Sequence, residues 1–212
     1  MKGRLLPVAT AAGALGLALG GSAAETISMF ARPTIARANE RVTATGVVGS
    51  GRADQLVTVQ SRPCDETTWR DIAETATYEG GGWTIDFSPG VSGLFRATSA
   101  GAESEPLKLQ TRPSVSLGQR PPGKFFVTVN AQRQFWHRKV VLQRFDTKKR
   151  LWIDVRRILL TETGATPGLP WIWSGSDKVR VVVPKGTTMR AVLPLSATRP
   201  CYLAGYSNLL RR

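Results

Sequence analysis

Two neighbouring stretches of this chain decide its fold, Val57-Thr58-Val59-Gln60 and Trp69-Arg70-Asp71-Ile72. In the first, apolar and polar side chains alternate, which is the period of a β-strand with one buried face. Thr84-Ile85-Asp86-Phe87 alternates in the same way. No stretch of the sequence shows a sustained helical period of apolar residues. The sequence therefore predicts an all-β protein.

Four motifs of the first half return in the same order in the second half, with spacings that grow only by insertion. The pairs are Arg32-Pro33-Thr34-Ile35 with Arg112-Pro113-Ser114-Val115, Val59-Gln60 with Leu142-Gln143, Trp69-Arg70-Asp71-Ile72 with Trp152-Ile153-Asp154-Val155, and Phe95-Arg96-Ala97 with Met189-Arg190-Ala191. Self-similarity of this kind indicates a domain that occurs twice. We place the boundary near Arg112-Pro113, which gives domains at 25–112 and 113–212.

Each copy reads as seven short strands rich in Val, Ile, Thr and aromatic residues, separated by Gly, Pro, Ser and Asp turns. We expect strands near 27–35, 41–48, 55–62, 68–75, 83–88, 93–98 and 105–111, and near 113–118, 124–130, 138–146, 151–160, 178–184, 188–194 and 203–210. Seven strands in a unit of this length is the count of a small β-sandwich. The predicted fold is two tandem seven-stranded immunoglobulin- or fibronectin-like β-sandwich domains.

The repeated pattern of Val-x-x-Gln, Trp-x-Asp-Ile and Phe-Arg-Ala resembles the tandem immunoglobulin-like repeats of secreted actinobacterial proteins. The resemblance covers nearly all of the chain after residue 24. Its motifs belong to the framework of the fold, so it implies a fold and export. It implies no catalytic or binding residues.

The start of the chain has the pattern of a signal peptide over residues 1–24. A basic opening, Met1-Lys2-Gly3-Arg4, precedes an uncharged run from Leu5 to Gly20, and Ser22-Ala23-Ala24 supplies the small residues that precede a cleavage site. The alternative is a retained membrane anchor, although the run is short for a span of about 20 apolar residues. We expect a secreted, extracellular or cell-envelope protein with no membrane span after cleavage.

The sequence contains few candidate catalytic residues. His137 is the single histidine, which excludes most Ser–His, Cys–His and zinc sites. Asp71 and Asp154 are repeat equivalents and so belong to different domains, which favours a local structural role for each over a catalytic pair in one cleft. Gly80-Gly81-Gly82 lies between strands and has no following helix to hold a phosphate. We expect no enzyme, no cofactor and no metal.

The charge is concentrated in the second domain. Residues 25–112 hold nine Lys/Arg and eleven Asp/Glu, whereas residues 113–212 hold eighteen Lys/Arg and four Asp/Glu. Successive turns of a sandwich alternate between its two ends, so the first, third and fifth turns of the second domain share the end away from the first domain with the C-terminus. The predicted basic residues there are Arg120, Lys124, Lys148, Lys149, Arg150, Lys185, Arg211 and Arg212.

A basic surface of this kind attracts anionic polymers through long-range electrostatics and counterion release. The hypothesis is a non-enzymatic module that binds an anionic envelope polymer, acidic polysaccharide, anionic lipid headgroups or extracellular DNA. Nucleic acid is disfavoured as the physiological ligand, because no basic strands with interleaved aromatics are present. The alternatives are a rigid spacer or protein-interaction element whose basic surface only aids solubility, and an unusual Asp/Arg or Tyr enzyme.

Two tryptophans, Trp171 and Trp173, fall in the segment 161–177 that the first copy lacks. Its Gly and Pro content predicts a long loop. The pair could stack on sugars, or it could fill the junction between the domains.

The two cysteines, Cys64 and Cys201, are predicted to form a disulfide between the domains. Each falls in a turn that should face the other domain, and an oxidising compartment permits them to pair. The alternatives are two free thiols or a bridge between molecules.

The signal-peptide hypothesis predicts that the exported protein begins at Glu25. Mass spectrometry of secreted protein should return a mass and an N-terminal peptide that start there. A membrane-bound product that retains Met1 would contradict it.

Overall fold

The computed structural model describes residues 25–120, 123–176 and 178–212. Regular structure in these ranges is almost entirely β, with one short helix, α1 (Leu195–Thr198). The prediction of an all-β protein is confirmed. Across these ranges, no helix has the length and apolar content needed to cross a membrane. The predicted signal peptide, 1–24, lies outside the described residues.

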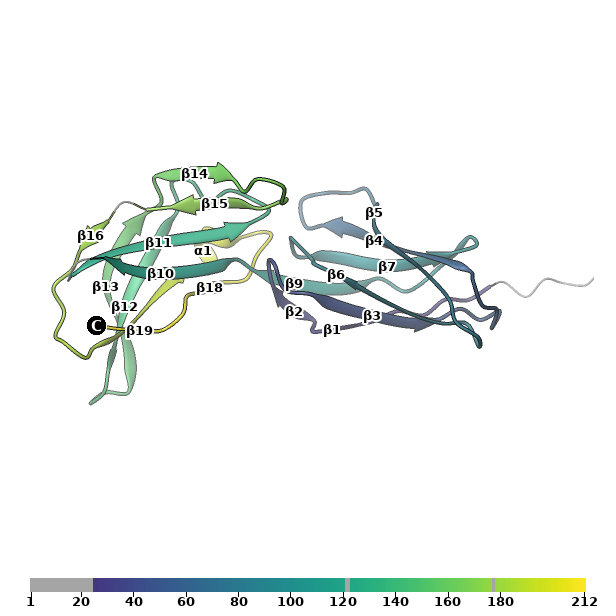
Figure 1. The fold of residues 1–212 in the computed structure, drawn as a ribbon, viewed down its shortest axis with the longest axis horizontal. Coiled ribbons are helices and arrows are strands. Elements are labelled where there is room, and N and C mark those ends of the chain that lie inside the picture. The colour runs from purple at the N-terminus through teal and green to yellow at the C-terminus, as the bar shows by residue number, and fades with distance from the viewer. Residues whose placement is uncertain (1–24, 121–122, 177) are drawn as a thin grey trace, which may run out of the picture.

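The first half of the chain forms two sheets around one hydrophobic core (Figure 1). Its strands are β1 (Phe30–Arg32), β2 (Ile35–Arg37), β3 (Val42–Val47), β4 (Leu56–Pro63), β5 (Arg70–Ala76), β6 (Gly82–Phe87), β7 (Gly93–Ser99), β8 (Ala102–Glu103) and β9 (Leu107–Arg112). One sheet has the order β1-β3-β6, and the other has the order β2-β9-β7-β4-β5 with β8 beside β7. The alternation in β4 buries Val57 and Val59 completely in the core.

The second half also forms two sheets around a core of its own. Its strands are β10 (Ser114–Arg120), β11 (Lys124–Ala131), β12 (Lys139–Asp146), β13 (Leu151–Leu159), β14 (Glu162–Ala165), β15 (Ile172–Gly175), β16 (Val179–Arg180), β17 (Thr188–Leu193), β18 (Gly205–Tyr206) and β19 (Leu210–Arg211). One sheet runs β10-β11-β15-β14 with β16 beside β11. The other runs β13-β12-β17-β18 with β19 beside β17.

The strands differ from the expected ones in several places. A short extra strand, β8, follows β7; of 178–184 only β16 is regular, and 203–210 contains only β18 and the first residue of β19. The strand expected at 27–35 is divided, because Pro33 has no N–H to continue a ladder: β1 pairs with β3, and β2 crosses to the other sheet and pairs with β9. The loop expected at 161–177 contains the hairpin of β14 and β15. The glycine and proline content that suggested a loop belongs partly to the turn of this hairpin, where Gly168 has a positive φ of 72°.

The repeated motifs build a side-chain network on the outer face of the first half. The Gln60 amide donates to Asp71 at 2.8 Å, and Nε of Arg96 donates to Gln60 at 2.9 Å. The Arg96 guanidinium lies 4.4 Å from the centre of the Trp69 ring, a cation–π contact. The network therefore links β4, β5 and β7 next to a bulge at Val59/Gln60, where the register of β4 and β5 shifts.

The second half contains the same network at the equivalent positions. The Gln143 amide donates to Asp154 at 2.7 Å, and Nε of Arg190 donates to Gln143 at 2.8 Å. Arg190 lies 4.1 Å from the centre of the Trp152 ring. The β12–β13 register shifts between Leu142 and Gln143, so the bulge is repeated as well. The sequence repeat is thus a repeat of tertiary contacts.

The two halves lie end to end and are joined by a disulfide (Figure 1). Cys64 follows β4, and Cys201 follows α1 in the segment between β17 and β18; their Cα atoms are 5.4 Å apart and 137 residues separate them in the sequence. The predicted pairing is therefore confirmed. Cys64 is exposed, whereas Cys201 is buried in the core of the second half.

Backbone and side-chain hydrogen bonds reinforce the junction around this disulfide. The Ser92 N–H donates to the Cys201 carbonyl at 3.1 Å, and the Leu203 N–H donates to the Thr111 carbonyl at 2.9 Å. The Arg112 guanidinium donates to the Ala204 carbonyl at 2.8 Å. These contacts involve segments on both sides of Pro113, so they restrict the angle between the two halves.

An ion pair crosses the junction as well. Nη2 of Arg133 lies 3.0 Å from Asp65 and 3.5 Å from Glu66. Val91 and Ala38, from the first half, are buried in the core of the second half. The junction thus combines covalent, polar and apolar contacts.

Arg190 should contribute measurably to stability, because it joins the network by a hydrogen bond and a cation–π contact. We expect Arg190→Met to lower the free energy of unfolding by about 1–3 kcal/mol. The matched control is Arg138→Met, an exposed arginine outside the network, which should change it by less than about 0.5 kcal/mol. Urea unfolding followed by tryptophan fluorescence measures both, and equal effects would contradict the role given to the network.

The disulfide closes a long loop, for which chain entropy predicts a stabilisation of up to about 5 kcal/mol. The double variant Cys64→Ser/Cys201→Ser should therefore unfold at a clearly lower urea concentration than the oxidised protein. Wild-type protein reduced with dithiothreitol is the control and should shift by a similar amount. An unchanged midpoint in both would show that the bond does not constrain the unfolded chain.

Candidate functional site: the basic end of the second half

The cations predicted to gather at the free end come from four segments of the second half. The β10–β11 turn, the β12–β13 hairpin, the segment before β17 and the C-terminus carry them. Figure 1 shows these segments at the end of the molecule that faces away from the first half. Seven of the eight side chains are exposed, and Arg212 is half-buried.

Strand pairing aligns three cations at the ends of β10, β11 and β16. Arg120, the last residue of β10, is the register partner of Lys124, the first residue of β11. Lys124 is in turn the partner of Arg180 in β16. Directly paired side chains on neighbouring strands lie about 5 Å apart at Cβ. Arg120, Lys124 and Arg180 therefore form a row of three positive charges across the strand ends.

The C-terminus lies next to this row. The Gly186 N–H donates to the Arg212 carbonyl at 2.6 Å, and the Arg212 N–H donates to the Thr187 carbonyl at 3.0 Å. These bonds hold Arg211 and Arg212 beside the turn that carries Lys185. A side chain on Gly123 would begin 3.8 Å from Nη2 of Arg212, so the C-terminus also lies against the β10–β11 turn. We call Arg120, Lys124, Arg180, Lys185, Arg211 and Arg212 the basic end.

The remaining three predicted cations, Lys148, Lys149 and Arg150, form the tip of the β12–β13 hairpin. Asp146 organises this turn, because one of its carboxylate oxygens accepts the N–H groups of Lys148 and Lys149, each at 3.0 Å. The Lys149 N–H makes the largest contribution to lowering the pKa of Asp146, followed by the Lys148 N–H and the positive charges of Arg144 and Lys149. Asp146 therefore stays ionised, and its carboxylate accepts the hydrogen bonds that hold the backbone of the turn.

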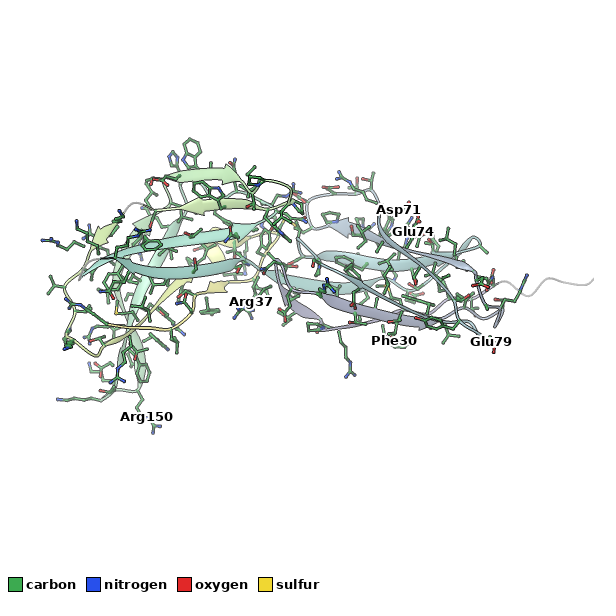
Figure 2. All side chains as sticks on the ribbon, in the orientation of Figure 1. Phe30, Arg37, Asp71, Glu74, Glu79 and Arg150 are labelled. Atoms are coloured by element: carbon green, nitrogen blue, oxygen red, sulfur yellow. A yellow bond between two sulfur atoms is a disulfide. The ribbon has the colours of Figure 1, made fainter. Side chains whose placement is uncertain are left out.

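The hairpin tip projects away from the rest of the molecule. Figure 2 shows Arg150 at its outer end and Asp71, Glu74 and Glu79 on the first half. The structure thus brings six cations together at the basic end and holds three more on a separate extension.

Within the described parts of the chain, none of these nine cations forms an ion pair with a carboxylate. The ion pairs there are Arg70–Glu66, Arg96–Glu103, Arg133–Asp65 and Arg133–Glu66, which lie in the first half or at the junction. Among these residues Asp146 is the acid beside the hairpin tip, and the cations of the basic end and hairpin tip have no ion-pair partner.

Two arginines at this end are absent from the residues that sequence reasoning selected. Arg180 lies inside an expected strand, 178–184, of which only β16 is regular. Arg156 comes from β13, and its Nη1 donates to the Arg180 carbonyl at 3.4 Å. The selection took residues at three turns and at the C-terminus, so it missed cations at strand positions that strand pairing carries to the same end.

A hollow lined by basic side chains lies near the start of β12, apart from the basic end. It has a volume of about 500 Å³, and the cationic groups around it are Arg138, Lys139 and Arg157, beside His137. Asp154, which accepts from Gln143, also lines it. Basic side chains are thus found at both ends of the outer face of β12 and β13.

The two tryptophans of the β14–β15 hairpin have different surroundings. Trp171 packs against the core of the second half. Trp173 lies on the outer face of its sheet, over Gly164. The junction hollow of about 720 Å³, which the disulfide lines, contains neither tryptophan among its described lining residues.

The described residues include one group of potential metal ligands. The group of potential metal ligands found among them is Cys64, Asp65 and Cys201, whose two sulfurs are bonded to each other. His137 is exposed, has a positive φ of 59°, and stacks on Trp136 with ring centres 3.8 Å apart.

Comparison with protein-family models finds no match for this chain, and no curated protein matches it either.

Proposed function

We propose that this protein is an exported, non-enzymatic binding module that holds an anionic polymer of the cell envelope or its surroundings at the free end of its second half. Wall polymers and acidic polysaccharides have the required chemistry, because each presents regularly spaced negative charges. The contact would be made by the basic end and the hairpin tip.

One observation carries the proposal: nine cations that form no ion pair among the described residues lie at one end of an elongated molecule, six at the basic end and three on the hairpin tip. If a basic surface served only solubility, its cations could be dispersed over the whole surface. Here, however, strand pairing and the C-terminal hydrogen bonds hold six of them together. A polyanion that neutralises such a cluster gains affinity by releasing condensed counterions.

The proposal includes the finer architecture expected from the sequence. We take the two halves to be tandem immunoglobulin-like domains, related to the repeats of secreted actinobacterial proteins. The repeated Gln–Asp–Arg–Trp network and the repeated bulge support a duplication. Export is supported by the disulfide, since such bonds persist in oxidising compartments.

A second candidate function is that of a rigid spacer or protein-interaction element. The junction favours it, because a disulfide, hydrogen bonds and an ion pair together resist bending. The two functions are compatible if the first half sets the distance at which the second half presents its basic end.

Removing the charges of the hairpin tip tests the binding proposal. The variant is Lys148→Ser/Lys149→Ser/Arg150→Asn, with Asn at position 150 because that residue has a φ of 52° and asparagine tolerates this conformation. Binding to heparin should weaken, and the slope of log K against log salt should become shallower by up to about one unit per cation removed. Isothermal titration calorimetry at several NaCl concentrations measures both quantities.

The matched control removes the same charge from the first half. Arg37→Ser/Arg41→Ser/Arg52→Ser changes three exposed arginines that lie outside the basic end and hairpin tip. It should leave the affinity within about twofold of wild type. Equal weakening by the two triple variants would mean that heparin responds to total charge and that the free end is no binding site.

A further inference from the structure

The outer face of the β10-β11-β15-β14 sheet carries two half-buried aromatic rings, Phe126 and Trp173. Each ring covers the glycine directly opposite on an edge strand: Phe126 covers Gly118, and Trp173 covers Gly164. A Cβ atom on Gly164 would lie within 2.8–2.9 Å of Nε1, Cε2 and Cζ2 of Trp173. Three nearly equal distances mean that the indole lies flat over the glycine.

A flat ring on a glycine has one face against the backbone and leaves the other face outward. Such an aromatic cover of a cross-strand glycine stabilises the sheet. It also holds the ring rigidly, so little conformational entropy would be lost when a ligand stacks on it. Trp171 packs on the core, whereas Trp173 does not belong to the core cluster.

The space between the two rings is hollow. Thr128 and Gly175 are register partners in its floor, and the hollow has a volume of about 630 Å³. Trp173 pairs with Asn130, four residues along β11 from Phe126, so the backbone positions that carry the two rings are roughly 14 Å apart along the strand direction. This span suits a short oligosaccharide better than a single small ion.

Polar groups of two kinds line this hollow. Arg120 and Lys178 supply positive charge, and Arg120 is also a member of the basic end. Glu162, Thr128 and Ser176 supply oxygen atoms that accept hydrogen bonds from hydroxyl groups, and the two alcohols also donate. The combination of flat rings, oxygen acceptors and cations matches a sugar that bears hydroxyls and a carboxylate.

We propose that this face, which we call the aromatic groove, is a subsite for an acidic polysaccharide containing uronic acid. The C–H face of a sugar ring would stack on Trp173, and a carboxylate would lie near Arg120 and Lys178. This inference rests on the proposed function and deepens it, because it selects acidic glycans among the anionic polymers. A polyanion without rings would use only the cations.

Two probes separate stacking from charge: a hyaluronan tetrasaccharide and an inorganic polyphosphate. Trp173→Ala should weaken binding of the tetrasaccharide by about tenfold, the upper range of an aromatic contact. It should change polyphosphate binding by less than about twofold, because no ring is involved. Trp136→Ala, which removes an exposed tryptophan that does not line the hollow, should leave both affinities unchanged.

Trp173→Phe keeps an aromatic ring at this position, so it still tests the inference if the alanine variant fails to fold. It should bind the tetrasaccharide within about threefold of wild type but lose the change in tryptophan fluorescence that the ligand causes. Thermal unfolding of each variant shows whether the fold is intact.

The inference is overturned if wild-type protein fails to bind the tetrasaccharide, or if Trp173→Ala binds it as wild type does. Equal losses for both probes with an intact fold also overturn it. The hairpin-tip variant tests the proposed function separately: if that variant binds polyphosphate as well as wild type does, the site of the proposed function is wrong. In that case the comparison between the Trp173 variants still tests whether the aromatic groove binds the tetrasaccharide.

Discussion

The contact between an arginine, a glutamine and an aspartate beside a tryptophan ring sets the geometry of both halves of this protein. In each half, the arginine comes from the central strand, β7 or β17, and the glutamine from its neighbour. The aspartate lies on the edge strand, immediately beyond a bulge. A bulge locally interrupts strand pairing and increases twist. The side-chain bonds maintain the alignment of three strands at the point where the backbone ladder is weakest.

In the second half this network lies in a longer row of stacked side chains. Arg112 lies 5.7 Å from the Tyr206 ring, Arg190 contacts both Tyr206 and Trp152, and Trp152 packs on Phe145 with ring centres 5.3 Å apart. The row begins at the junction, where Arg112 also bonds to Ala204, and reaches the last residue pairs before the hairpin tip. The same contacts that stabilise the sheet therefore also support the extension that presents Lys148, Lys149 and Arg150.

Much of this arrangement could be predicted from the sequence. The alternation in Val57-Thr58-Val59-Gln60 predicts a strand with one buried face, and turn order alone places Cys64 and Cys201 at one junction. Other features depend on tertiary contacts that no local pattern records. The hairpin of β14 and β15 has the glycine and proline content of a loop, and it becomes ordered by pairing with β11. Arg180 joins the basic end because it pairs with Lys124 of β11. Trp173 lies flat on the sheet because the residue opposite it, nine positions earlier in the sequence, is a glycine.

The central claim is that anionic polymers contact the free end of the second half and leave the first half untouched. Amide chemical shifts of the ¹⁵N-labelled full chain, titrated with heparin at low and high salt, test this claim residue by residue. The account predicts that shifts concentrate at the basic end and the hairpin tip, and that they fade as salt rises. The residues concerned are Arg120, Lys124, Lys148, Lys149, Arg150, Arg180, Lys185, Arg211 and Arg212. Shifts of similar size on the strands of the first half, or shifts that persist unchanged at high salt, would contradict it.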